Sequence, residues 1–331
     1  MQRVAIVGVG GMGNVHGRAY REMLNAQPVA VVDIRPEVAE TTAKNLDCEW
    51  FTDFDEMMAA VDPDVVSVCT PTPWHKEYAV KAAQAGKNIV VEKPMARSLE
   101  DCREMVEAAE RAGVTLMVAH VLRFFPEFAT AKAQVDAGAV GNPAIVRTTR
   151  AGTYPRASND WFGNFDWSGG AILDLIIHDF DWLRWTFGDV ERVYAKGLIH
   201  RKIEHTDYAL VTLRFKSGVI AHVDTSWLNP TGFVVQFEIA GDDGLIEFRN
   251  QISTPLTIAQ IKSTDEKPGV VIPESPTMQD PYLQELQHFI DCIEKGEKPS
   301  ITPEDGLRAV EIGLAAIESI HIGKPVDLPM V

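Results

Sequence analysis

The sequence predicts an α/β fold in which a doubly wound parallel sheet comes first and an α+β domain with an open-faced, largely antiparallel sheet follows. In residues 1–120, short β-branched runs alternate with helical segments, and a glycine-rich turn follows the first run. This alternation favours parallel strands with right-handed crossovers. In residues 121–331, alternating runs are joined by glycine-containing turns, which favour antiparallel hairpins. We therefore expect two domains, 1–120 and 121–331.

The composition is that of an acidic, soluble globular protein. Of the 331 residues, 46% are hydrophobic and 24% are charged, and the formal net charge of −16 disfavours binding to the phosphate backbone of nucleic acids. No run of 18 apolar residues occurs, so we expect no membrane span. The four cysteines form no C-x-x-C pair, which is typical of a reducing cytosol. We expect a cytoplasmic protein without a metal requirement, because no His/Cys cluster has ligand spacing.

The first half contains the runs expected of buried parallel strands. They lie at residues 4–7, 29–33, 65–69, 88–94 and 114–118, with helices expected at 14–25, 75–85 and 98–112. Ligands of such sheets bind beyond the carboxyl ends of the strands. The residues at these predicted ends are Gly8, Asp33, Thr70, Glu92, Lys93 and His120.

The stretch GVGGMG lies between the first strand and the following helix. Gly8, Gly10 and Gly13 have G-x-G-x-x-G spacing around Met12, and Asp33 follows Gly13 by 20 residues. This combination predicts a dinucleotide-binding Rossmann domain, in which the glycines let the pyrophosphate approach the backbone and the start of the helix. A glycine turn with an unrelated aspartate is the alternative.

Asp33 favours NAD over NADP as the cofactor. Its carboxylate would accept hydrogen bonds from the adenosine ribose hydroxyls and would repel a 2′-phosphate. Arg35 lies two residues further on and could pair with such a phosphate. NADP therefore stays open as a second cofactor.

Lys93 lies between Glu92 and Pro94 at a strand end that faces the predicted cofactor cleft. A lysine there can donate a hydrogen bond to a substrate oxygen, and Pro94 stiffens the turn that carries it. The alternative is a solvated surface lysine.

The second half predicts strands at 208–215, 219–227, 233–240 and 245–248, with further strands at 143–151 and 190–198 and helices near 282–295 and 303–321. Trp227, Phe237 and Phe248 are consistent with a sheet-to-sheet interface or an interface with a neighbouring subunit. An intramolecular layer explains the same three residues.

The stretch GGAILDLIIHDFDWLRW, residues 169–185, predicts an apolar helix with a polar stripe. Asp174, His178 and Asp181 fall on one narrow line of a continuous helix, whereas Asp179 points elsewhere. One interpretation is structural, with Asp181 orienting His178 or pairing with Arg184. The other is catalytic, because perturbed ionisable groups gather at functional sites.

The preceding loop, residues 152–170, is rich in Asn, Asp and aromatic residues and contains Trp161. Aromatic faces stack on C–H surfaces while polar groups bind hydroxyls, so the loop suits a polyhydroxylated ligand. An ordinary turn-rich loop is the alternative.

Five motifs together resemble the glucose–fructose oxidoreductase and inositol dehydrogenase family (Gfo/Idh/MocA). They are GVGGMG at 8–13, CTPTPWH at 69–75, VVEKP at 90–94, RFFP at 123–126 and GGAILDLIIHDFD at 169–181. The resemblance covers the whole chain. It implies a Rossmann domain followed by an open-faced domain, assembled into a homodimer or homotetramer through that sheet.

The resemblance also implies roles for single residues. Lys93 and His178 would stand at the reacting carbon, with Asp174, Arg123 and Trp161 binding substrate. The cofactor-binding set would be Gly8, Gly10, Met12, Gly13, Asp33, Arg35, Thr70, Pro71, His75, Glu92 and Lys93. The chain departs from the family pattern at Thr72, where Asn is frequent, at Val121 and Leu122, where polar residues are common, and at Ala171, where a third glycine is expected.

The leading hypothesis is an NAD(P)-dependent oxidoreductase acting on a secondary alcohol of a sugar, sugar acid or cyclitol. Hydride would go to the nicotinamide, while neutral His178 takes the hydroxyl proton and Lys93 stabilises the oxygen. An NAD-dependent glycoside hydrolase and a non-catalytic dinucleotide-binding sensor are the alternatives. A sensor need not keep Lys93 and His178, which this chain has.

Overall fold

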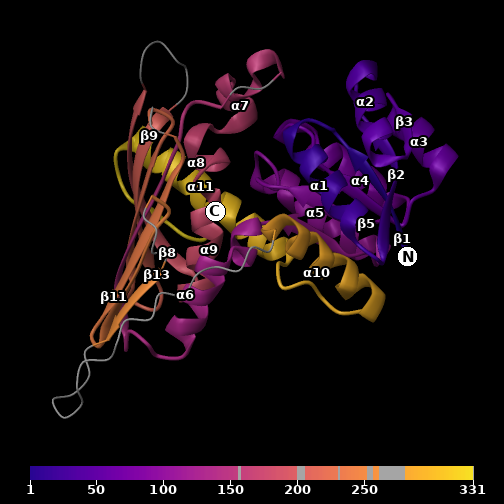
Figure 1. Cartoon of the computed structure of the whole chain (residues 1–331). Helices are drawn as coiled ribbons and strands as arrows, with labels where there is room; N and C mark the ends of the chain where they lie inside the picture. Colours follow the sequence, from indigo (N-terminus) through magenta and orange to yellow (C-terminus); the bar gives the residue numbers. More distant parts are fainter. Residues whose placement is uncertain (156–157, 200–205, 230–231, 252–255, 261–279, 331) are drawn as a thin grey trace. The chain divides into compact units, whose positions relative to one another are not determined.

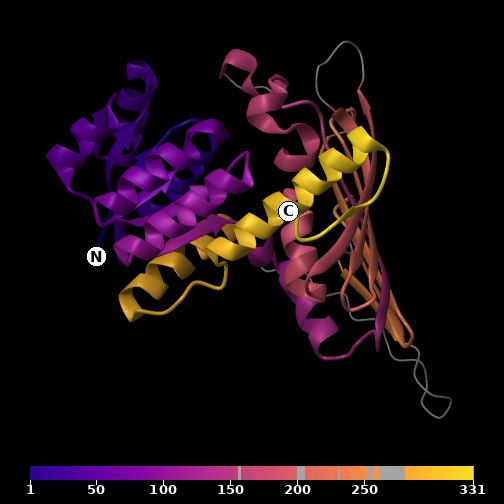
Figure 2. The ribbon, with the colours of Figure 1, turned by 180° about the vertical axis from the view of Figure 1, so that it is seen from behind.

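The computed structural model describes residues 1–155, 158–199, 206–229, 232–251, 256–260 and 280–330. The chain divides into two compact units (Figures 1 and 2). The first combines Met1–Val121 with Gln279–Val310, and the second combines Leu122–Met278 with Glu311–Val331. The expected division into domains 1–120 and 121–331 stays a prediction. A domain is a part of the chain that folds separately, whereas the two units are defined by compactness alone.

The first unit contains a six-stranded sheet of order β3-β2-β1-β4-β5-β6, in which all neighbouring strands are parallel. The strand order reverses between β1 and β4, as in a doubly wound sheet. The strands are β1 (Gln2–Val7), β2 (Ala26–Val32), β3 (Glu49–Phe51), β4 (Val65–Val68), β5 (Asn88–Glu92) and β6 (Leu116–Ala119). The expected parallel sheet is confirmed.

Some helices of this unit begin at a residue whose side chain caps them. They are α1 (Gly11–Glu22), α2 (Pro36–Leu46), α3 (Phe54–Val61), α4 (His75–Gln84), α5 (Leu99–Ala112) and α10 (Pro281–Lys295), with the 3₁₀ turn η1 (Thr72–Trp74). Ser98 caps α5 by accepting a hydrogen bond from the Asp101 amide at 3.0 Å, and Asp280 caps α10. Asn25 bonds to Asp291 of α10 at 3.1 Å, so α10 packs beside the end of α1.

The second unit contains an eight-stranded sheet of order β13-β12-β11-β7-β10-β9-β8-β14. Its strands are β7 (Pro143–Ala151), β8 (Val190–Ile199), β9 (Thr206–Phe215), β10 (Ile220–Ser226), β11 (Val234–Gly241), β12 (Gly244–Arg249), β13 (Leu256–Gln260) and β14 (Val326–Asp327). Only β7 and β10 pair in parallel, and the other described neighbours are antiparallel. The largely antiparallel sheet is confirmed.

Helices cover one face of this sheet, as Figures 1 and 2 show. They are α6 (Pro126–Asp136), α8 (Gly170–Asp174), α9 (Ile177–Phe187) and the part of α11 (Pro303–Ile322) that begins at Glu311. The loop before α8 holds η3 (Ser158–Gly163) and α7 (Phe165–Ser168), and η2 (Val121–Phe124) precedes α6. Buried residues alternate along β10 and β11, so one side of each strand enters the core. The opposite side carries Ile145, Leu198, Leu210 and Ile220, which are 39–65% exposed.

The aromatic residues of the sheet settle one of the open alternatives. Phe237 and Phe248 are only 3% and 5% exposed. The Phe237 ring lies 5.0 Å from Phe128 of α6 and 5.0 Å from Trp182 of α9, measured between ring centroids. These residues therefore belong to an intramolecular layer between sheet and helices, and their expected role at a neighbouring subunit is wrong.

Several elements escaped the sequence analysis. Residues 34–64 form α2, β3 and α3, which are short, and α6 has no single apolar stripe.

The continuous helix expected over residues 169–185 is wrong, because the segment breaks at Leu175 and Ile176 into α8 and α9. The Leu175 and Ile176 amides both bond to the Ala171 carbonyl, which offsets the register of the two helices.

Two buried ion pairs hold α9 in place. Asp181 receives two hydrogen bonds from the Arg123 guanidinium, at 2.7 and 2.5 Å. Asp179 receives one from Arg150 of β7, at 2.6 Å. All four side chains are at most 5% exposed. The expected pairing of Asp181 with Arg184 is wrong, since Asp181 pairs with Arg123 and Arg184 pairs with Asp189. The expected orienting of His178 by Asp181 stays a prediction.

Replacing Asp181 tests this anchoring. Asp181→Ala leaves the Arg123 charge buried without its carboxylate, so we expect the free energy of unfolding to fall by about 3–5 kcal/mol. Asp327→Ala breaks the exposed pair with Arg192 and serves as the control, with little expected change. Urea-induced unfolding followed by circular dichroism measures both. Equal losses in the two variants would contradict the prediction.

Candidate functional site

The site in the first unit begins where the strand order reverses, at the carboxyl ends of β1 and β4. Gly8 follows β1 and has φ +83°, and a Cβ added there would lie 2.8 Å from the Thr70 Cα. The Gly8 amide donates to the Val32 carbonyl at 2.7 Å, and the Cys69 amide donates to the Val7 carbonyl at 2.7 Å. This turn therefore requires glycine both for its conformation and for its close approach to Thr70.

The other two glycines of the motif meet different surroundings. A Cβ on Gly13 would lie 2.0 Å from the Gly8 carbonyl oxygen, so only glycine lets α1 pack on this turn. A Cβ on Gly10 would meet no atom within 4 Å, so the backbone there borders open space. No side chain caps the start of α1, where Met12 is half-buried. These residues fit a cradle in which amide N–H groups bind a pyrophosphate.

The Thr70 hydroxyl adds to this fit. Its oxygen is buried and has no hydrogen-bond partner among the described residues. A buried hydroxyl without a partner costs free energy unless a ligand or water satisfies it. Pro71 follows Thr70 and is half-buried, so the turn after β4 offers both a hydroxyl and a ring beside Gly8.

Asp33 follows β2 and is held as a carboxylate. It accepts hydrogen bonds from the Val9 amide at 3.1 Å and from the Arg35 amide at 3.0 Å. The Arg35 guanidinium adds two more, each at 2.9 Å. Burial alone would raise the pKa of Asp33, but the bonds from Arg35 and Val9 outweigh it and lower the pKa below its usual value. A ribose diol would therefore compete with Arg35 for this carboxylate.

His75 connects the two turns that follow β4 and β5. Its Nδ1 lies 3.0 Å from the Pro94 carbonyl oxygen, and its Nε2 lies 2.8 Å from the Thr70 carbonyl oxygen. Burial lowers the pKa of His75, so the ring is neutral near pH 7 and donates to one of the two carbonyls at a time. The imidazole thus ties Thr70 to the turn that carries Lys93.

Glu92 is the last residue of β5 and is 7% exposed. Its Oε1 lies 3.0 Å from His16 Nε2, and its Oε2 accepts the Lys93 amide at 3.1 Å. Burial raises the pKa of Glu92, but the hydrogen bond from His16 and the charges of His16 and Lys93 outweigh it and lower the pKa. Glu92 therefore acts on the Lys93 backbone, while the Lys93 residue itself is half-buried.

The second unit holds the other candidate residues. Asp174 ends α8 and His178 is the second residue of α9, so they are separated by the break in the helix. Both are half-buried, whereas the ion-paired Asp179 and Asp181 are each 1% exposed. The polar residues thus divide into two deeply buried anchors and two residues that reach toward the surface.

Arg123 and Trp161 differ in their surroundings. Arg123 is 6% exposed and gives two hydrogen bonds to Asp181. Trp161 lies in η3, half-buried, and stacks on Phe162 with ring centroids 3.9 Å apart. Phe162 in turn packs edge-on against Trp227. Arg123 therefore supports α9 through Asp181, whereas Trp161 lies beside the aromatic rings of Phe162 and Trp227.

Sequence reasoning missed the residues that support Glu92. His16 of α1 bonds to Glu92 and, at 2.8 Å, to the Ser67 hydroxyl, and Tyr20 donates to Ser67 at 3.4 Å. The signal was present, because His16 and Tyr20 are four residues apart and therefore share one helix face. Their partners lie 47 to 76 residues away, and no local pattern identifies them.

The described residues contain no group of three His, Cys, Asp or Glu that could hold a metal ion. Metal independence stays a prediction. Among the described helices, none could span a membrane.

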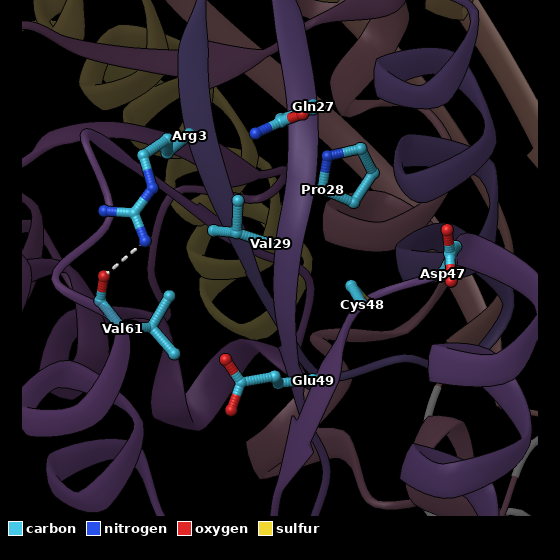
Figure 3. A pocket seen from close by; sticks show the side chains of 8 residues that line it. All are labelled: Arg3, Gln27, Pro28, Val29, Asp47, Cys48, Glu49 and Val61. Atoms are coloured by element: carbon cyan, nitrogen blue, oxygen red, sulfur yellow. Dashed lines mark hydrogen bonds between the residues drawn. The ribbon is translucent and has the colours of Figure 1, made fainter.

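A pocket of about 450 Å³ lies at the opposite end of the first unit's sheet, near the starts of β2 and β3 (Figure 3). It is lined by Arg3, Gln27, Pro28, Val29, Asp47, Cys48, Glu49 and Val61 and includes none of the predicted site residues.

Comparison with known proteins agrees with this arrangement. Residues 2–120 match the model described as "Oxidoreductase family, NAD-binding Rossmann fold". Residues 128–247 match the GFO/IDH/MocA C-terminal domain. The first unit is therefore an NAD-binding Rossmann domain.

Three similar proteins span nearly the whole chain. A scyllo-inositol 2-dehydrogenase (NAD(+)) from Bacillus subtilis is 32% identical, with 98% of this chain and 96% of that protein covered. A myo-inositol 2-dehydrogenase from Thermotoga maritima is 30% identical, with 98% of each covered. The solved structure of a levoglucosan dehydrogenase with NADH and levoglucosan is 25% identical, with a TM-score of 0.90 and with 99% of this chain and 100% of that chain covered.

The glycine contacts lead to a paired test. Gly13→Ala places a methyl group 2.0 Å from the Gly8 carbonyl oxygen, so we expect loss of thermal stability and of NAD binding together. Gly10→Ala meets no protein atom within 4 Å, so we expect the melting temperature to be kept while NAD binding weakens by about tenfold or more. Thermal melts and calorimetric titration with NAD measure the two effects. Full NAD affinity in Gly10→Ala would contradict the cradle.

Proposed function

Because the chain belongs to the Gfo/Idh/MocA oxidoreductase family, we propose that it is an NAD-dependent dehydrogenase that oxidises a ring secondary alcohol of a cyclitol, sugar or sugar acid. The observation that carries the proposal is the similarity to two proteins named as inositol 2-dehydrogenases. Each aligns with 98% of this chain, at 32% and 30% identity. Lys93, Asp174 and His178 are half-buried polar residues, which supports the proposal.

The cofactor would be held by the residues at the carboxyl ends of β1, β2, β4 and β5. The amides near Gly10 and Met12 would bind the pyrophosphate, and Asp33 would accept the ribose hydroxyls as Arg35 turns aside. Thr70, Pro71, His75 and Glu92 would shape the nicotinamide end. When bound, NAD supplies the hydride acceptor.

The substrate hydroxyl requires a base and a stabilising cation. We assign the base to His178, because the imidazole is the side chain that most readily both gains and loses a proton near neutral pH. Lys93 would donate a hydrogen bond to the same oxygen and stabilise its alkoxide character. Asp174 would bind a neighbouring hydroxyl or orient the imidazole.

Two further residues take different proposed roles. Trp161 would present its ring to the C–H face of the substrate. Arg123 was expected to bind substrate, but a guanidinium that is 3% exposed and bonded twice to Asp181 suits support of α9 better. We therefore propose that Arg123 positions the His178 helix.

The open face of the second sheet supports assembly. Ile145, Leu198, Leu210 and Ile220 are exposed on that face, where Ile145 lies opposite Ile220, and contiguous exposed apolar groups mark interaction surfaces. We propose a homodimer or homotetramer through this face. The free cysteines, Cys48, Cys69, Cys102 and Cys292, agree with the expected cytoplasmic location.

A substrate panel tests the function directly. Inositol isomers, aldoses and aldonic acids are incubated with NAD or NADP, and reduced cofactor is followed by its absorbance. Net NADH formation from a free polyol is the expected result. Release of an aglycone from a glycoside without net NADH would instead identify a glycoside hydrolase.

Cofactor preference depends on Asp33. The wild type should favour NAD, because the Asp33 carboxylate repels a 2′-phosphate. Asp33→Ala should lower the kcat/KM for NAD relative to that for NADP, or make NADP the preferred cofactor. The reason is that the substitution also releases Arg35 from its two bonds to Asp33. The double variant Asp33→Ala, Arg35→Ala should lose the gained NADP activity. A wild type that prefers NADP would contradict the assignment.

The catalytic assignment is tested by removing each proposed group. His178→Ala should keep NAD affinity and lower kcat by about 10²–10⁴, the usual contribution of general acid–base catalysis. Lys93→Met should lose a similar factor, and the two losses should not add because both groups act on one oxygen. The wild-type rate should rise with pH, because the base acts only in its neutral form. Near-wild-type kcat in His178→Ala would reject this mechanism.

A further inference from the structure

A buried polar cluster in the first unit contains a thiol that the proposed dehydrogenase mechanism does not use. Cys69 directly follows β4 and precedes Thr70 at the proposed cofactor turn. We propose that Cys69 is a reactive thiol, activated by His16 and oxidised by hydroperoxides to a sulfenic acid.

Cys69, His16 and Glu92 have the geometry of a nucleophile, a base and an orienting carboxylate. The Cys69 Sγ lies 3.3 Å from His16 Nδ1. The other ring nitrogen of His16, Nε2, lies 3.0 Å from Glu92 Oε1. Such an arrangement activates a thiol when the base lies within hydrogen-bond reach and a third group orients it. The Cys69 backbone is fixed by its bond to the Val7 carbonyl, so the sulfur has a defined position.

The hydrogen bonds place His16 where it can receive the Cys69 proton. Ser67 Oγ lies 2.8 Å from His16 Nδ1 and 3.8 Å from the Cys69 Sγ. If His16 were neutral with its proton on Nε2, the Ser67 hydroxyl and the Cys69 thiol would compete for one lone pair on Nδ1. Once His16 has taken the thiol proton, both of its N–H groups have acceptors, with Glu92 on one side and the sulfur and Ser67 on the other.

The charges around the cluster agree with this state. Burial alone would lower the pKa of His16, but the neighbouring Cys69 and Glu92 outweigh it and raise the pKa well above its ordinary value. The Glu92 carboxylate in turn faces the charge of Lys93. Tyr20 faces the same cluster and also Glu285 of α10, and burial raises the pKa of this phenol, which therefore stays protonated.

The other cysteines lack this environment. Cys48, which is also half-buried, lies between Asp47 and Glu49 (Figure 3), and burial with these two carboxylates raises its pKa to about 11. Cys102 is buried and has a pKa raised to about 12, mainly by burial.

Cys292 is the closest comparison, because it too lies beside a histidine. The His288 ring nitrogens are 3.7 and 3.9 Å from its sulfur, farther than His16 is from Cys69. His288 Nε2 accepts the Ser300 amide at 2.9 Å, and burial lowers the pKa of His288, so the ring is neutral. Cys292 therefore lies beside a neutral histidine, and burial raises the pKa of its thiol.

The oxidation balances with a hydroperoxide as the named oxidant. The Cys69 thiolate attacks one peroxide oxygen, an S–O bond forms and the O–O bond breaks. The leaving oxygen takes the proton of the His16 imidazolium and departs as water or an alcohol. The sulfur loses two electrons, the peroxide gains them, and His16 becomes neutral.

Oxidation has a consequence for the cofactor, and this consequence rests on the proposed function. Thr70 packs so closely on Gly8 that a methyl group does not fit between them. An oxygen added at the preceding residue would disturb that contact and remove the charge pair with His16. Sulfenylation of Cys69 should therefore weaken NAD binding by about tenfold or more.

Thiol reactivity is measured on the folded full-length protein with iodoacetamide at pH 7, and mass spectrometry gives a rate constant for each cysteine. Cys69 should react at least about 100-fold faster than Cys48, because a thiol with the pKa of Cys48 carries almost no thiolate at pH 7. It should also react faster than the same residue in urea-unfolded protein. His16→Gln should slow Cys69 by about tenfold or more, whereas His288→Gln should leave its rate unchanged.

Peroxide treatment with a dimedone trap should then label Cys69, and Cys69→Ser should abolish the label. Calorimetry should show weaker NAD binding in the peroxide-treated wild type. Peroxide treatment should leave the NAD affinity of Cys69→Ser unchanged. A folded Cys69 that reacts no faster than Cys48, or than itself in the unfolded chain, overturns the proposal even if the His16 variant does not fold. These thiol measurements need no substrate, so their failure is distinct from failure of the proposed dehydrogenase activity.

Discussion

The Gly8 and Thr70 backbones approach each other so closely that a single methyl group between them would clash with the Thr70 Cα at 2.8 Å. This contact lies where the strand order reverses, between β1 and β4. Gly13 then packs on the Gly8 carbonyl and sets the position of α1, which carries His16. The place of the cofactor turn, of α1 and of the network behind them therefore depends on one approach of backbone to backbone.

Buried polar side chains join the strand ends that this contact brings together. His75 bonds to carbonyls of the turns after β4 and β5, and His16 connects α1 to β4 and β5 through Ser67 and Glu92. In a low-dielectric interior, such groups stabilise one arrangement strongly when all are paired and cost free energy when one is lost. The Lys93 turn is thereby fixed by residues that themselves touch no substrate in the proposed mechanism.

The second unit obtains its order in a different way. A mixed layer of aromatic and aliphatic side chains packs helices on one face of the sheet, and two buried arginine–aspartate pairs fix α9 within it. Asp179 and Asp181 both lie within the first turn and a half of α9, just after His178. The anchors are fully buried while Asp174 and His178 reach toward the surface, so one short segment combines structural and proposed catalytic residues.

The sequence by itself determined the parts whose signal is local. The G-x-G-x-x-G spacing, the apolar strand runs and the glycine turns between alternating runs predicted both sheets, because each depends on residues close together in the chain. Only the tertiary structure decided the rest. Arg123 meets Asp181 across 58 residues and His16 meets Glu92 across 76, and the helix expected over 169–185 breaks at Leu175. Which buried charges pair is set by the packing of distant elements, because the cost of burying a charge depends on what lies opposite it and not on its neighbours in sequence.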